Sequence, residues 1–173
     1  MQAIRKPGQN DNTGRRGLLK IWLMGCAVVL LLGNNVLLSD DQPRHANDTV
    51  FFDEGPLAGQ GYPFSESVRT GNLLFLSGQI GEDGSGKPVP GGIKAEANQV
   101  LLNITKALER RGLGLEHVVK CTVFLVDIDE WGAFNEVYKQ YFKPPYPARS
   151  ALAASGLAIG ARVEVECIAH FPG

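Results

Sequence analysis

The apolar and polar positions of residues 61–110 predict a hairpin followed by a helix. Two short predicted strands at residues 65–69 and 73–77 flank a Gly-Asn pair, which supplies the positive φ angle that a hairpin turn requires. Residues 73–76 are apolar without a break, so we expect this strand to be covered on both faces. Apolar side chains then recur at helical spacing over residues 93–108, which indicates an amphipathic helix.

After this helix, the pattern predicts a β-branched strand at residues 118–126, parallel in direction to the strand at residues 73–77. The elements expected next are a helix at residues 131–141 and strands at residues 148–153 and 162–171. Trp131 and Tyr138 fall on the apolar stripe of the second helix, and we expect both to face the core. The order ββαβαββ defines an α+β domain whose mixed sheet is backed by two helices.

The composition of the chain argues against nucleic-acid binding and against a metal site. The 173-residue chain is 44% hydrophobic and 20% charged, as in a globular protein with one core. A formal net charge of -1 gives no general attraction to polyanions, which argues against a nucleic-acid partner. The three cysteines and three histidines lack the spacing of a metal site, so no metal is expected. Cys121 and Cys167 lie on predicted core strands and are interpreted as small buried hydrophobic side chains rather than nucleophiles.

Residues 1–38 have the pattern of a signal peptide or of an N-terminal transmembrane anchor. Basic residues precede an uncharged, mostly aliphatic stretch at residues 21–33. This stretch is shorter than a spanning helix needs, but it nearly reaches that length when read on to Leu38, so both alternatives stay open. The charge asymmetry predicts export to the periplasm, with the domain either released or tethered to the inner membrane by residues 18–38. Any membrane contact is expected through this segment alone.

The export route and the start of the folded domain follow from shorter patterns. Arg15 and Arg16 resemble a twin-arginine signal, with an ordinary secretory signal as the alternative. Cys26 ends a weak match to a lipobox. Residues 39–60 lack helical or strand periodicity and are predicted to be a linker or extension, which leaves residues 61–173 as the folded domain.

Six short segments of this domain carry a resemblance to a known family. They are residues 63–68 (PFSESV), 76–80 (LSGQI), 119–125 (VKCTVFL), 135–138 (NEVY), 147–150 (PARS) and 163–169 (VEVECIA). In order and spacing they resemble the Rid (YjgF) family of imine and enamine deaminases. The resemblance implies a chorismate-mutase-like fold, a homotrimer, and pockets at the subunit interfaces.

The resemblance also implies a set of site residues. In deaminating members the arginine of the PARS segment holds the substrate carboxylate, and here that residue is Arg149. A guanidinium suits this role because it stays charged and offers planar paired donors. The other pocket positions of the family correspond to Ser77, Gly78, Asn135, Ala151 and Glu164. Glu164, expected near Arg149, would orient the hydrolytic water without any cofactor. Without the resemblance, Arg149 would be interpreted as a member of a surface or interface salt bridge. Glu164 would be interpreted as an exposed carboxylate on a strand.

Two positions depart from the family pattern. Phe64 stands where a tyrosine is common, which removes a phenol hydroxyl, and Ala151 stands where cysteine is frequent. The expected function is hydrolysis of small carboxylate-bearing imines and enamines, such as 2-aminoacrylate, to 2-keto acids and ammonia. The alternatives are a non-catalytic protein that binds or senses small carboxylates, and an endoribonuclease, the label historically attached to relatives.

Overall fold

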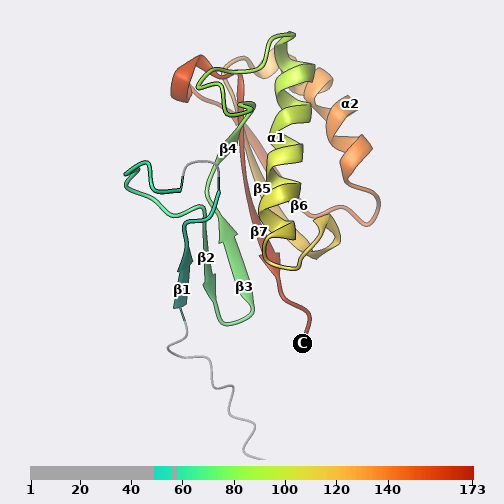
Figure 1. The fold of residues 1–173 in the computed structure, drawn as a ribbon. Coiled ribbons are helices and arrows are strands. Elements are labelled where there is room, and N and C mark those ends of the chain that lie inside the picture. Colours follow the sequence, from blue (N-terminus) through green and yellow to red (C-terminus); the bar gives the residue numbers. More distant parts are fainter. Residues whose placement is uncertain (1–48, 56–57) are drawn as a thin grey trace, which may run out of the picture. The chain divides into compact units, whose positions relative to one another are not determined.

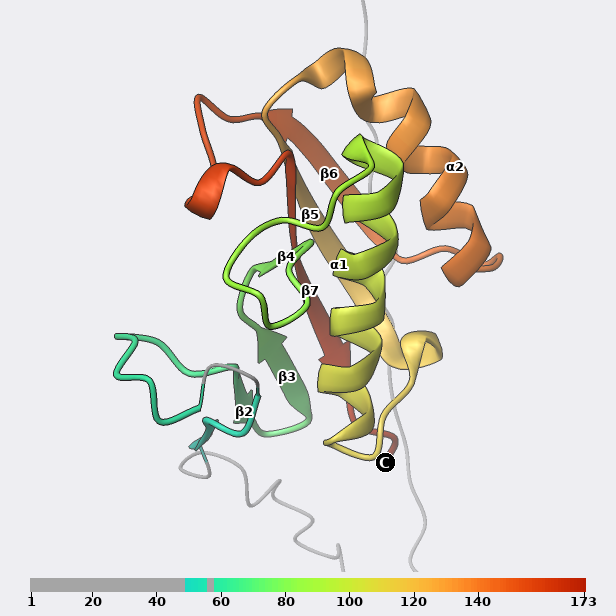
Figure 2. The same cartoon turned by 45° about the horizontal axis from the view of Figure 1, so that its top comes forward.

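The structure, a computed structural model, describes residues 49–55 and 58–173, which form a seven-stranded sheet with two helices on one face (Figure 1, and turned in Figure 2). The strands are β1 (Thr49–Phe52), β2 (Ser67–Thr70), β3 (Leu73–Leu76), β4 (Gln79–Ile80), β5 (Val118–Leu125), β6 (Ala148–Ala153) and β7 (Val163–His170). The helices are α1 (Gly92–Glu109) and α2 (Trp131–Tyr141). Every predicted helix and strand is confirmed, and β1 and β4 are added to the predicted order.

The predicted signal or anchor segment, residues 1–38, lies outside the described residues. Within the described part of the chain, no helix combines the length and the apolar character needed to cross a membrane.

The sheet is mixed, as predicted. Its strand order is β1-β2-β3-β7-β5-β6, with β4 also paired to β7. Because β7 is antiparallel to both β3 and β5, these two strands run in the same direction with β7 between them. β6 joins β5 in parallel register at the edge of the sheet. The α+β architecture with two helices backing one face is therefore confirmed.

The core lies between the sheet and the two helices. The inner side chains of α1 are fully buried, among them Leu101 and Leu108. At the end of α1 the Leu113 amide donates to the Leu108 carbonyl oxygen at 3.0 Å, and Gly112 has a φ of 69°, the left-handed conformation that ends a helix. Residues of β7 alternate between buried and solvent-facing, as the sequence pattern predicts.

The strand β3 is covered on one face, not on two. Leu74 and Leu76 are buried beneath the helices, whereas Leu73 and Phe75 are 41% and 39% exposed on the opposite face. The expectation of cover on both faces is therefore wrong among residues 49–55 and 58–173. A continuous apolar strand with one open face is typical of an interaction surface.

The sheet begins inside the segment expected to be a linker or extension, residues 39–60. Strand β1 pairs with β2, and the guanidinium of Arg111 lies 3.9 Å from the centre of the Phe52 ring. Arg111 also donates from Nη2 to Glu54 Oε2 at 2.8 Å. These contacts fix residues 49–55 against the end of α1. Local periodicity did not reveal them because Glu54 and Arg111 are 57 positions apart.

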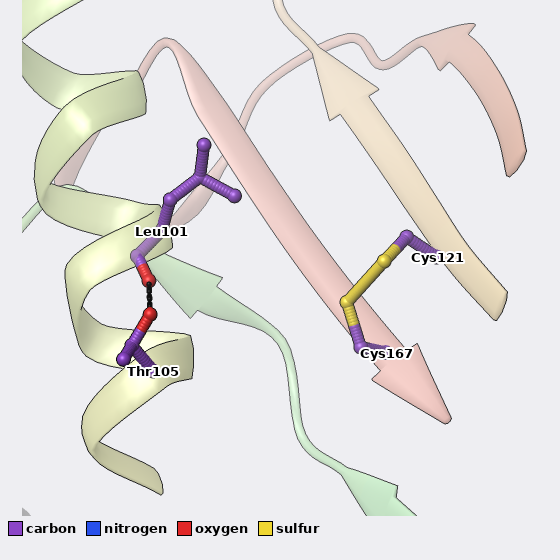
Figure 3. The surroundings of a disulfide bond; sticks show 4 residues. All are labelled: Leu101, Thr105, Cys121 and Cys167. Carbon is purple, nitrogen blue, oxygen red and sulfur yellow. Dashed lines mark hydrogen bonds between the residues drawn. A yellow bond between two sulfur atoms is a disulfide. The ribbon is translucent and has the colours of Figure 1, made fainter. Parts of the chain in front are cut away.

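A disulfide joins Cys121 of β5 to Cys167 of β7 beneath α1 (Figure 3). The two residues are direct partners in the strand register and are 0% and 2% exposed. Their predicted burial is confirmed. Their covalent pairing was not predicted, because it depends on how two strands separated by 46 positions align.

Candidate active site

Arg149 lies on β6 with its guanidinium packed against α2. Its strand position aligns with Cys121, whose side chain is buried on the helix side of the sheet, so Arg149 projects to that same side. Nη2 donates to Asn135 Oδ1 at 2.7 Å, and the guanidinium carbon lies 4.5 Å from the centre of the Tyr138 ring. One face of the guanidinium therefore rests on an aromatic surface, which stabilises the cation.

The guanidinium opens into a pocket of about 330 Å³ lined by Ile128, Trp131, Arg149 and Ala151. Within residues 49–55 and 58–173, Asn135 is the hydrogen-bond partner of Arg149, so most of its N–H donors remain available to a ligand. A permanently charged planar donor in an otherwise apolar pocket suits a small carboxylate. Three residues predicted from the sequence, Asn135, Arg149 and Ala151, are thus brought together.

A second group of predicted residues meets where β3 gives way to β4. Both strands pair with β7, and the break between them falls at Ser77 and Gly78. The Ser77 hydroxyl donates to the Ser65 carbonyl oxygen at 2.7 Å. A Cβ atom added to Gly78 would overlap the carboxylate of Glu164, with its Cδ only 2.8 Å away. Glycine is therefore required at residue 78 for the Glu164 carboxylate to lie against this backbone.

Arg149 and Glu164 lie on opposite faces of the sheet. Glu164 aligns with Phe124, while Arg149 aligns with Cys121, and residues 121 and 124 of β5 project to opposite sides. The expectation that Glu164 lies near Arg149 is therefore not met within one chain. The predicted site residues form two half-sites, which we call the arginine half-site (Asn135, Arg149 and Ala151) and the carboxylate half-site (Ser77, Gly78 and Glu164).

Burial changes the protonation behaviour of Glu164 in the carboxylate half-site and of Tyr138 beside the arginine half-site. Partial burial, followed by the charge of nearby Glu166, raises the pKa of the Glu164 carboxyl above its ordinary value. Burial also raises the pKa of Tyr138 to about 12, although the charge of Arg149 acts in the opposite direction. Glu164 thus holds a proton more readily than an exposed glutamate does, whereas Tyr138 stays a neutral phenol beneath the guanidinium.

Two pocket residues were missed by the sequence reasoning. Trp131 was expected to face the core, but it is 46% exposed and lines the pocket, together with Ile128 from the turn before α2. The spacing contained a usable signal, because Trp131, Asn135 and Tyr138 at positions i, i+4 and i+7 share one helix face. Tyr138 on this face is buried, as predicted.

The aromatic residues before β2 lie on the surface. Phe64 is 49% exposed and packs with Tyr62, with ring centres 5.6 Å apart. Both residues come just before Ser65 in the sequence, and the Ser65 carbonyl oxygen accepts the hydrogen bond from the Ser77 hydroxyl. Among the described residues, no group of three or more His, Cys, Asp or Glu side chains is placed to hold a metal ion.

Comparisons with known proteins agree on one family. The sequence profile described as Endoribonuclease L-PSP matches residues 58–171. A goat (Capra hircus) protein named 2-iminobutanoate/2-iminopropanoate deaminase is 46% identical over 108 residues, which cover 62% of this chain and 79% of that protein. The crystal structure of RidA from a Psychrobacter species is 37% identical, with a TM-score of 0.63 over 69% of this chain and 95% of the other. The structure of Escherichia coli TdcF with bound serine is 30% identical, with a TM-score of 0.63 over 70% of this chain and 98% of the other.

Proposed function

Because the chain belongs to the Rid (YjgF) family, we propose that it hydrolyses reactive 2-imino and 2-enamino acids to 2-keto acids and ammonia. The observation that carries this proposal is the Arg149 guanidinium, held by Asn135 and Tyr138 at the base of a small pocket. The goat relative named a deaminase of such imines supports the reaction class.

The reaction needs a carboxylate anchor, a water molecule and a proton carrier. Arg149 binds the substrate carboxylate through its planar donors. The Glu164 carboxylate accepts a proton as water attacks the imine carbon, and it passes that proton to the nitrogen, which gives a carbinolamine. It then takes the proton of the new hydroxyl and passes it to the amino group, so that the C–N bond breaks, the hydroxyl oxygen becomes the keto oxygen and ammonia leaves. The raised pKa of the Glu164 carboxyl suits this exchange, because a carrier works best when its pKa approaches the working pH.

The active site in this proposal forms between copies of the chain in a homotrimer. The two half-sites lie on opposite faces of one sheet, so Arg149 of one copy must meet Glu164 of a neighbouring copy. The sheet face opposite the helices offers a row of aligned apolar side chains for this contact, namely Phe51, Val68, Phe75 and Ile168. Phe51 is 69% exposed in the single chain, and an apolar row of this kind is typical of an interface.

The compartment is part of the same proposal. In this proposal the domain is exported to the periplasm, where it is either released or tethered to the inner membrane by residues 18–38. The Cys121–Cys167 disulfide supports export, because disulfides persist in oxidising compartments. Mass spectrometry after thiol alkylation in denaturant tests it: protein from the periplasmic fraction of expressing cells should carry unlabelled Cys121 and Cys167. Full labelling of both, or recovery of the protein only from the cytoplasm, would contradict export.

The test of the function is the release of 2-keto acid from imines generated in place by an amino-acid oxidase, corrected for spontaneous hydrolysis. The wild-type chain should accelerate release. Arg149→Ala should abolish the acceleration, and Arg149→Lys should retain a small part, because an ammonium keeps the charge but loses the planar fork. Lys143→Ala, an exposed cation whose ammonium donates to the Lys139 carbonyl oxygen, serves as the matched control and should keep full activity.

The same preparation separates the alternatives. Tight binding of 2-keto acids that depends on Arg149, without any acceleration, would indicate a carboxylate-binding protein instead. Cleavage of RNA that survives Arg149→Ala would favour the endoribonuclease alternative.

A further inference from the structure

Beside the carboxylate anchor, the pocket has an apolar wall made of Trp131, Ile128 and Ala151. We infer that this wall is a side-chain subsite that makes the chain prefer 2-imino acids with large apolar substituents, such as those derived from leucine and phenylalanine. The inference rests on the proposed function. It goes further by naming the residues that would determine which imines the chain hydrolyses fastest.

Trp131 and Ile128 are large apolar side chains left half open to solvent. Trp131 is 46% exposed at the first position of α2, and Ile128 is 47% exposed in the turn before it. The centre of the Trp131 ring lies 5.9 Å from the guanidinium carbon of Arg149, within cation–π range but further away than the Tyr138 ring. The space open to a ligand is the pocket of about 330 Å³ that both side chains line.

Their position relative to Arg149 matches the shape of a 2-imino acid. The carboxylate carbon is bonded to the imine carbon, which also bears the side chain, so a bound carboxylate on Arg149 places the substituent one bond further on. Trp131 and Ile128 lie at the start of α2 and in the turn before it, at the rim of the pocket. Ala151 lies two residues after Arg149 on β6, so its side chain projects to the same face of the sheet. Because this side chain is only a methyl group, it leaves room for a ligand beside the Arg149 guanidinium.

The chemistry of the wall decides the preference. A methyl substituent would leave most of the indole and isoleucine surface in water, whereas an isobutyl or benzyl substituent would remove that surface from water. Each methylene buried against an apolar wall strengthens binding about fourfold. We therefore expect leucine-derived imine to be hydrolysed at least about tenfold more efficiently than alanine-derived imine, after correction for spontaneous hydrolysis.

The experiment compares these two imines with the full chain and two variants. Trp131→Ala should reduce the preference for leucine-derived over alanine-derived imine at least about fivefold. Trp131→Phe retains an aromatic wall and should keep most of the preference. Equal losses on both imines in Trp131→Ala, or an alanine-derived imine used as well as the leucine-derived one by the wild-type chain, would overturn the subsite while leaving the deaminase proposal standing.

A binding measurement separates failure of the subsite from failure of the reaction. The chain has two tryptophans, so in a Trp22→Phe variant Trp131 is the one that remains. Titration with 4-methyl-2-oxopentanoate should shift its emission and show affinity at least about tenfold higher than pyruvate. This result without any imine turnover would support the subsite and refute the deaminase. Equal affinities, or an unchanged emission at saturation, would overturn the subsite whatever the turnover.

Discussion

Two inactive variants should restore activity in mixed trimers, because the proposed active site takes its two half-sites from two chains. One variant is Arg149→Ala, which lacks the carboxylate anchor, and the other is Glu164→Gln, which lacks the proton carrier. The strand register places these residues on opposite faces of the sheet, so neither chain can complete a site alone. When the two variants are co-expressed, a neighbouring pair can combine the intact Arg149 of one chain with the intact Glu164 of the other.

The expected gain follows from the cyclic geometry. In a ring of three, each interface takes its arginine from one chain and its carboxylate from the next chain in a fixed direction. A trimer that contains both variants has one interface at which both residues are intact, whichever variant is present twice. Mixed trimers should therefore show about one third of wild-type activity.

The assay is keto-acid release by trimers purified through two different tags, one on each variant, so that only mixed trimers are recovered. Trimers of each single variant, purified in the same way, give the background. Activity of mixed trimers no higher than that background would refute the shared site. A shared site is also refuted if light scattering shows the wild-type chain to be a monomer.

Three further predictions concern the disulfide, the β3–β4 break and pH. Replacing Cys121 and Cys167 by alanine removes a link across 46 positions, so the free energy of unfolding in denaturant should fall by about 4 kcal/mol; a change below about 1 kcal/mol would contradict this. Gly78→Ala displaces the Glu164 carboxylate and should lower kcat at least about tenfold with the trimer intact by light scattering. In the proposed mechanism, activity requires ionised Glu164 and should be lost as pH falls through its raised pKa. Glu166→Gln removes a like charge and lowers that pKa, so it should move the acid limb of kcat/KM to lower pH, whereas an unmoved limb would contradict the assignment.

The sequence was sufficient for the two helices, for the main strands and for the residues of the arginine half-site. The helices and the main strands were predictable because their periodicities of 3.6 and 2 are local properties of the chain. Arg149, Asn135 and Ala151 were predictable from segments that resemble a known family, and the structure places them together between β6 and α2. The alternation of β7 was likewise readable from its side chains.

The structure decided whatever depends on how distant segments align. The pairing of Cys121 with Cys167 follows from the register of β5 and β7. The place of β1 in the sheet follows from its pairing with β2, and Arg111 contacts this segment through Phe52 and Glu54. Sequence alone placed Glu164 beside Arg149, but side chains on adjacent strands share a face only when their registers agree. That agreement is fixed by hydrogen bonds between strands far apart in the chain, so only the folded sheet could divide the predicted site residues into two half-sites.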